Sequence, residues 1–244
     1  MKGLMLHCGA TSTSREDLLN LPIPAGTATH HPVEHHRFLD LTERALGSYG
    51  LNISEQSYGV TKDGNRFFGL LGIKDESNPE WQNVVGLRNS HDKKFPASLV
   101  MGSSVFVCDN LCFSGEIKVA RKHTAKINQA LPGLVFEAAE KLELGFAKQN
   151  KRIESYKNCD LSSRLQTNDL TVRLAEKGAI TYQQIKPLLE EYRNPKHPEF
   201  NDTNVWGFMN AVTETSKGIP LETLCKRTQV LHTVLDVECA VENN

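Results

Sequence analysis

The sequence predicts an α+β fold in one domain spanning residues 1–244, with a central antiparallel sheet of four to five strands. Strand-like alternation is confined to residues 51–130, whereas helical periodicity marks 1–50 and 131–244. The predicted strands follow one another through short connections, which favours antiparallel pairing. We therefore expect an N-terminal helical and loop part, a β-sheet core, and a C-terminal helical region.

Two helices are predicted before the sheet. Ser14 is a favoured N-cap residue and is followed by acidic residues, which indicates a short helix near residues 15–20. A second helix is expected from about Glu34 to Ser48, because its apolar residues share one face and Gly50 follows its end.

The centre of the chain predicts sequential strands. Asp63-Gly64 separates the first two and suits a type I′ hairpin turn. We expect residues 53–119 to form one mainly antiparallel sheet, with a helix near 132–157 packed across it. The strand-like runs are 53–61, 66–74, 81–89, 97–108 and 113–120.

Helical periodicity returns after Pro132 and continues to the end of the chain. Trp206 falls at helical spacing with other apolar residues, so we interpret it as a core residue. The expected later helices are one capped by Thr167 or Asn168 and ended by Gly178, one from Thr181, one capped by Asp202 and ended by Gly218, and one from Leu221 to Val241.

Composition places the chain among ordinary globular proteins. It is 39% hydrophobic and 23% charged, with a net charge of −1. No apolar run approaches the roughly 18 residues of a spanning helix, and no secretory signal is recognised. Scattered cysteines without such a signal indicate free thiols and a cytoplasmic location. No phosphate-binding or dinucleotide fingerprint and no full ligand set is found, so we expect no cofactor and no metal.

Charge is distributed unevenly along the chain. Residues 115–157 contain nine Lys and Arg against five Asp and Glu, whereas 190–244 contain five against nine. A strip of basic residues in the first of these ranges can contact the phosphates of nucleic acid or of a nucleotide, although a solvated positive face without a partner is the alternative. The basic strip after the predicted sheet consists of Lys118, Arg121, Lys122, His123 and Lys126.

A polar loop follows the third predicted strand. A histidine beside a carboxylate, as at His91 and Asp92, suits a general base, a metal ligand or a phosphate contact, whereas Asn, Ser and Asp also stabilise tight turns. Cys108 and Asn110 follow the next strand, and we expect Asn110 to converge with Asn89, His91 and Asp92 at one end of the sheet. The full motif set is Arg88, Asn89, Ser90, His91, Asp92, Cys108 and Asn110.

Four further histidines lie in a proline-containing stretch, THHPVEHH. Pro32 interrupts any continuous helix there, and no glutamate follows the first histidine as a zinc-protease motif requires. We therefore predict a surface loop. These histidines are His30, His31, His35 and His36.

The N-S-H-D loop, the V-C-x-N strand end and a late W-x-x-x-N-A-V-T-E helix resemble a phage- and plasmid-like family known only as a domain of unknown function. The resemblance spans residues 12–218 in the same order. The chain departs from the family's usual glycines at Lys93 and Leu111. The resemblance implies an accessory gene of a mobile element and brings no activity. The order of strands then long helix is also similar to single-strand annealing proteins of the Redβ and RecT type.

Three functions remain open. The leading hypothesis is a non-catalytic accessory protein that binds or anneals single-stranded nucleic acid through the basic strip. The second is a hydrolase or nuclease centred on His91 and Asp92. The third is a module that binds a host protein through its acidic C-terminal helices. We expect no membrane partner, and the sequence leaves homo-oligomers open.

Overall fold

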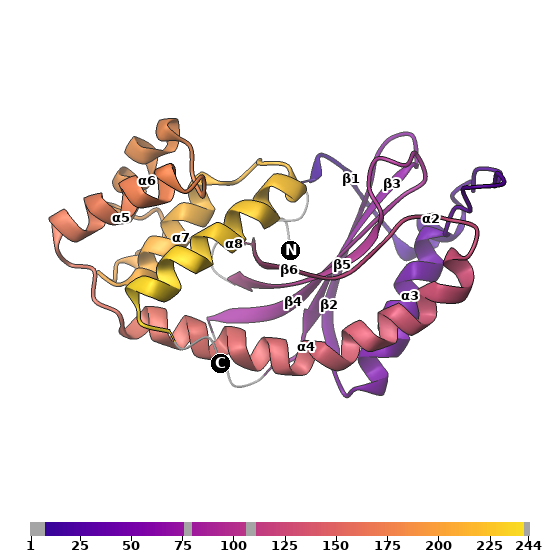
Figure 1. Ribbon diagram of the computed structural model, residues 1–244, viewed down its shortest axis with the longest axis horizontal. Helices are drawn as coiled ribbons and strands as arrows, with labels where there is room; N and C mark the ends of the chain where they lie inside the picture. Colours follow the sequence, from indigo (N-terminus) through magenta and orange to yellow (C-terminus); the bar gives the residue numbers. More distant parts are fainter. Residues whose placement is uncertain (1–7, 76–79, 106–110, 242–244) are drawn as a thin grey trace.

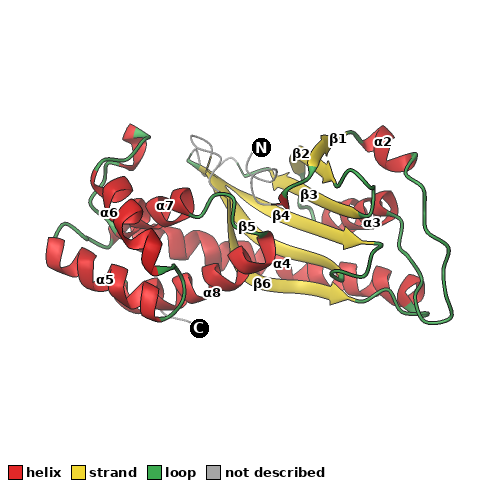
Figure 2. Cartoon of the chain, turned by 90° about the horizontal axis from the view of Figure 1, so that it is seen from above, coloured by secondary structure: helices red, strands yellow, loops and turns green. Residues whose placement is uncertain are grey.

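A computed structural model describes residues 8–75, 80–105 and 111–241. Its centre (Figure 1) is an antiparallel sheet whose strands lie in sequence order, as predicted for residues 53–119 (Figure 2). The sheet has six strands, one more than expected, because a short first strand pairs along the edge. The strands are β1 (Thr11–Thr13), β2 (Ile53–Val60), β3 (Arg66–Ile73), β4 (Trp81–Ser90), β5 (Ala97–Val105) and β6 (Leu111–Arg121).

The two helices before the sheet are confirmed. Helix α2 (Arg15–Leu19) begins after Ser14, whose side chain forms a capping box with Asp17. Helix α3 (His35–Ser48) is followed by Gly50 at a φ of +72°. A left-handed residue of this kind commonly terminates a helix, and glycine adopts that conformation without steric cost.

The β2–β3 hairpin has a different turn from the one predicted. A type I′ turn needs positive φ at both central residues, but of the Asp63-Gly64 pair only Gly64 has one, at +70°. Asp63 instead accepts hydrogen bonds from the Thr61 hydroxyl at 2.6 Å and the Asn65 amide at 3.1 Å. These bonds stabilise the connection between Val60, where β2 ends, and Arg66, where β3 begins, which is longer than a two-residue turn.

Helices α3 and α4 (Ile127–Asn158) cover one face of the sheet, as predicted for the long helix (Figures 1 and 2). Helix α4 starts at Ile127 rather than at Pro132, which lies in its second turn. Its first half contributes Leu131, Val135 and Leu142 to the core beneath the sheet. Its second half continues into the C-terminal helical region.

The C-terminal helices form a second core around Trp81, Tyr156 and Trp206, so the predicted core position of Trp206 is confirmed. Two caps differ from prediction: Ser163 and Asn204 start their helices, since their side chains accept the N–H of the third helical residue. The elements are α5 (Arg164–Glu176), α6 (Ile185–Arg193), α7 (Val205–Thr215), α8 (Leu221–Glu238) and short 3₁₀ turns at Tyr182–Gln184 and Pro198–Phe200.

Helix α8 also reaches back to the other face of the sheet. Leu221 and Leu224 in its first turns pack against Phe68, Val84 and Val100. The cover is partial, and it leaves a cavity between α8 and strands β4 and β5. Among the helices in the described part of the chain, none combines the length and apolar character that crossing a membrane requires.

Candidate nucleic-acid interface

Asn89, in the polar loop motif, is the centre of a buried hydrogen-bond network. Its side chain is 0% exposed. The amide nitrogen donates to the Val33 carbonyl at 2.7 Å and to Nδ1 of His35 at 2.9 Å. The amide oxygen accepts a hydrogen bond from Nε2 of His123 at 2.7 Å. One side chain thereby ties together the segment before α3, the end of β4 and the segment after β6.

The imidazoles around Asn89 share one tautomer. Nε2 of His35 donates to the Gly64 carbonyl at 3.0 Å, and Nε2 of His91 donates to the Val33 carbonyl at 2.8 Å. Since carbonyl oxygens only accept, both rings carry their proton on Nε2. The rings of His35 and His91 stack at 4.0 Å between centroids. Nδ1 of His91 is buried without a hydrogen-bond partner.

Burial keeps this cluster uncharged at neutral pH. It lowers the pKa of His35 to about 3 and the pKa of His123 to about 4. Burial also lowers the pKa of His91. Neighbouring imidazoles add to the effect, because a second positive charge nearby would be unfavourable. His123 therefore acts as a neutral hydrogen-bond donor and adds no positive charge to the predicted basic strip.

Asp92 stabilises the loop that follows β4. Its carboxylate accepts hydrogen bonds from Arg66 Nε at 2.7 Å, the Ser90 hydroxyl at 2.5 Å and the Lys94 amide at 3.2 Å. Burial opposes the charge, but the bonds from Ser90 and Arg66 outweigh it and lower the pKa of Asp92. No hydrogen bond joins Asp92 to His91 within the described residues, and the imidazole of His91 instead donates to the Val33 carbonyl.

Lys93 adopts the left-handed conformation, with a φ of +64°. This is the position at which the resembling family usually has glycine. The turn geometry is therefore retained without glycine, and the bonds made by Asp92 and Ser90 to Lys94 hold it in place. This turn places Lys93 at the rim of a pocket.

That pocket, here called the lysine pocket, has a volume of about 440 Å³. Lys93, Lys94 and Lys122 line it, and all three are exposed. None of the three has an ion-pair partner in the described ranges, and no carboxylate lines the pocket. His30 and Phe95 contribute rings to its wall, and Nε2 of His30 is buried without a hydrogen-bond partner.

Strand direction explains why the polar loop and the basic strip meet. Strands β4 and β6 each pair antiparallel with β5, so they run in the same direction and end on the same side of the sheet. Lys122 and His123 therefore lie beside the loop after Ser90. Arg121 at the end of β6 and Lys126 at the start of α4 are exposed nearby. Lys118 lies on β6, but its side chain is outside the described part.

Cys108 and Asn110 lie outside the described residues. Their flanks are at the other end of the sheet, because Val105 pairs with Trp81 and Leu111 pairs with Ser104. The expected convergence of Asn110 with His91 thus concerns a residue outside the described part and stays a prediction, while the flanks of Asn110 lie at the end of the sheet opposite His91. The physical reason is that β5 runs opposite to β4, so the end of one lies beside the start of the other.

The predicted surface loop of histidines is wrong for His35, which is buried at the start of α3. His30 is partly buried against His123, with ring centroids 5.5 Å apart. Sequence reasoning also missed Lys93 and Lys94 as pocket residues. Their position next to the loop motif was the available signal, but only the pairing of strands shows that Lys122 joins them.

Comparison with known proteins gives one family. The sequence profile described as a domain of unknown function, DUF932, matches residues 26–220. The chain belongs to the DUF932 family. The matched region includes the Asn89 network, the lysine pocket and helix α7. Neither the curated proteins nor the solved structures yield a match.

Proposed function

We propose that this DUF932 protein binds single-stranded nucleic acid, and that the lysine pocket contacts the phosphates of the strand. The observation that carries the proposal is the convergence of Lys93, Lys94 and Lys122 around a concave site, which no carboxylate of the described residues lines. Lysines are effective phosphate ligands, and the cost of their mutual repulsion is relieved when an anion enters. The role we propose is that of a non-catalytic accessory protein of a mobile element, in strand binding or annealing.

Ring side chains favour a single strand over a duplex. Phe95 and His30 border the lysine pocket, and bases of an unpaired strand can stack on such rings. The net charge of −1 also argues against a surface that covers duplex DNA, which usually carries a large basic excess. A local positive pocket suits a flexible strand that can enter it.

The hydrolase alternative has less support from the geometry. Asp92 is engaged by Arg66 and Ser90, and the imidazole of His91 faces the Val33 carbonyl. Within the ranges that the structure describes, no three His, Cys, Asp or Glu side chains are placed to hold a metal ion. These contacts give the loop a structural role that explains its residues without catalysis.

The protein-binding alternative relied on an acidic C-terminal region. Several of those carboxylates are paired within the chain: Glu214 with Lys196 and Lys217, Asp236 with Arg152, and Glu238 with Arg173. Internal pairing reduces the charge that these helices offer to a partner. We therefore rank the host-protein hypothesis below strand binding.

The experiment is fluorescence anisotropy with a labelled single-stranded oligonucleotide over a range of salt. Replacing Lys93, Lys94 and Lys122 together with Ala should weaken binding and flatten the slope of log K against log salt by about 2, since each contact on a single strand contributes about 0.7. The matched control replaces Lys151, Lys177 and Lys186, which are exposed and outside the pocket. Equal effects of the two triple variants would contradict the proposed site.

A further inference from the structure

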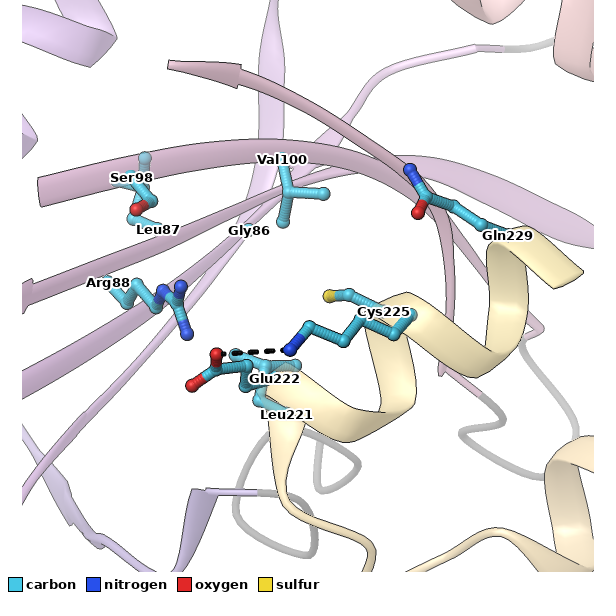
Figure 3. Close-up of a pocket in the computed structure, with 10 residues that line it drawn as sticks. Gly86, Leu87, Arg88, Ser98, Val100, Leu221, Glu222, Cys225 and Gln229 are labelled. Atoms are coloured by element: carbon cyan, nitrogen blue, oxygen red, sulfur yellow. Dashed lines mark ion pairs between the residues drawn. The ribbon is translucent and has the colours of Figure 1, made fainter. Parts of the chain in front are cut away.

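A second cavity, of about 410 Å³, lies between strands β4 and β5 and helix α8 (Figure 3). Figure 3 shows Arg88 and Gln229 at opposite ends of it, with Val100 between them. Its size falls within the range of small-molecule sites, which are mostly apolar with a few placed polar groups. Leu221 and Cys225 supply apolar surface from α8.

Arg88 links this cavity to the lysine pocket. Its guanidinium lies 5.0 Å from the ring centroid of Phe95, and Phe95 lines the lysine pocket. Gly86 and Arg88 line the cavity, and Ser90, on the same face of β4, lines the lysine pocket. Residues two apart on a strand are separated by about 7 Å, so the two sites adjoin along one face of the sheet.

Arg88 is also a cation without a carboxylate partner among the residues described. It is partly buried, and stacking on Phe95 occupies one face of its guanidinium while the edges retain their donors. A partly buried arginine in this state suits an anionic ligand that accepts from the fork. Glu222 and Lys226 of α8 also line the cavity, and they pair with each other at 3.6 Å.

We propose that the cavity beneath α8 receives a base of the bound single strand, and that Arg88 contacts the phosphate between this base and the lysine pocket. The inference rests on the proposed function and assigns the strand a path: phosphates in the lysine pocket, across Phe95 and Arg88, and a base under α8. Along this path the lysine pocket and Arg88 contact charged phosphates, whereas the cavity under α8 contacts a mainly apolar base.

The walls of the cavity suit a base. Val100 and Leu221 offer apolar surface for the ring faces, while Ser98 and Gln229 place polar atoms at the edges. Gly86 adds no side chain to the floor. Burial raises the pKa of the Cys225 thiol to about 11, so the thiol is neutral and compatible with a desolvated ring.

The test compares two labelled probes, an oligothymidylate and an oligomer of the same length with abasic sugars in place of nucleosides. Both carry the same phosphates, so any difference reports the bases. We expect the intact protein to bind the oligothymidylate more than about tenfold more tightly, because one buried base contributes on that scale and stacking on Phe95 and His30 adds to it. Cys225→Phe fills the cavity and should reduce the difference by about tenfold, the share of the buried base, while leaving the salt slope unchanged.

Arg88→Ala should flatten the salt slope by about 0.7 for both probes. This second variant decides the proposal if Cys225→Phe loses its fold. Cys239→Phe, in the second core, is the matched control for a larger side chain at a partly buried cysteine, and Arg164→Ala is the control for loss of an arginine outside both sites. Both controls should retain the difference and the slope.

The outcomes separate the two proposals. If neither probe binds, the proposed function fails. If both bind equally well, or if Cys225→Phe leaves the full difference unchanged, strand binding stands and the base site is wrong. If Arg88→Ala leaves the salt slope unchanged, the assigned path past Arg88 is wrong.

Discussion

Asn89 accounts for the arrangement of the candidate site at the level of single residues. It satisfies Val33, His35 and His123 together, so it fixes three separate segments beside the lysine pocket. Buried polar groups cost free energy when left without partners, which makes such a hub more important than its size suggests.

Replacing Asn89 with Ala should therefore lower the free energy of unfolding by about 3 kcal/mol, through lost hydrogen bonds and unsatisfied neighbours. Urea denaturation measures this change. Asn128→Ala is the control, because Asn128 is exposed and makes one long contact with Arg37 at 3.3 Å. A loss below about 1 kcal/mol for Asn89→Ala would show that the network is not a structural hub.

Lys93 gives a test of backbone strain. A non-glycine residue in the left-handed region is strained, so Lys93→Gly should raise the free energy of unfolding by about 0.5–1 kcal/mol despite the entropy of glycine in the unfolded chain. Lys94→Gly is the adjacent control, since Lys94 has no positive φ, and it should not stabilise. Thermal unfolding of both variants distinguishes them, and equal shifts would argue against strain at Lys93.

The buried histidines predict how stability depends on pH. Their folded pKa values are depressed, to about 3 for His35 and about 4 for His123, whereas the unfolded value is about 6.5. Above pH 6.5 these histidines are neutral in both the folded and the unfolded chain, so they do not make the free energy of unfolding depend on pH. As the pH falls from 6.5 toward 4, only the unfolded chain takes up protons, and stability falls by about 1.4 kcal/mol per pH unit for each such histidine.

Urea denaturation between pH 7 and pH 5 measures this slope, in a window above the titration of most carboxylates. His123→Gln should reduce the slope of the free energy of unfolding against pH by the contribution of one histidine, up to about 1.4 kcal/mol per pH unit. Stability that stays constant over this window would show that the histidines are not held neutral.

At the scale of elements, α4 joins the two cores, and the buried side chains near its end fix it against α8. Tyr156 donates to Asp236 at 2.6 Å, Arg152 pairs with the same carboxylate at 2.9 Å, and Nδ1 of His232 lies 3.1 Å from the Tyr156 hydroxyl. The position of α8, and with it the cavity over the sheet, depends on these contacts.

Asp236→Asn should cost about 3 kcal/mol, because it leaves Arg152 as a largely buried charge without its partner. The control is Glu137→Gln, which breaks an exposed pair with Lys141 and should cost at most about 0.5 kcal/mol. Chemical denaturation compares the two. Similar small losses in both variants would mean that the α4–α8 contact contributes little.

Elements with local signals were predictable from the sequence. Ser14 and Gly50 mark helix ends through backbone chemistry that acts within a few residues, and strand alternation is equally local. Strand β1 was missed because three residues carry no readable period. The caps at Ser163 and Asn204 were missed because several adjacent polar residues could have served.

The candidate site was only partly predictable. The polar loop and Lys122 were both recognised, but their meeting depends on β4 and β6 ending on the same side of the sheet, which is a property of the pairing. The same pairing places the flanks of Asn110 at the far end. The burial of His35 and His123 was likewise unpredictable, because their shared partner Asn89 is distant in sequence.

At the scale of the whole molecule, the end of the sheet beyond Ser90 gathers exposed lysines that have no ion-pair partner in the described ranges, while the C-terminal helices pair many of their cations. The central claim is that a single strand lies in the lysine pocket at that end. Photocrosslinking with a single-stranded oligonucleotide containing 5-iodouracil, followed by mass spectrometry of the peptides, tests it most directly. We predict crosslinks within residues 29–30, 93–96 and 122–126, and within 221–229 of α8 where the base is proposed to lie; a strand that binds but crosslinks only to α5, α6 or α7 would contradict the account.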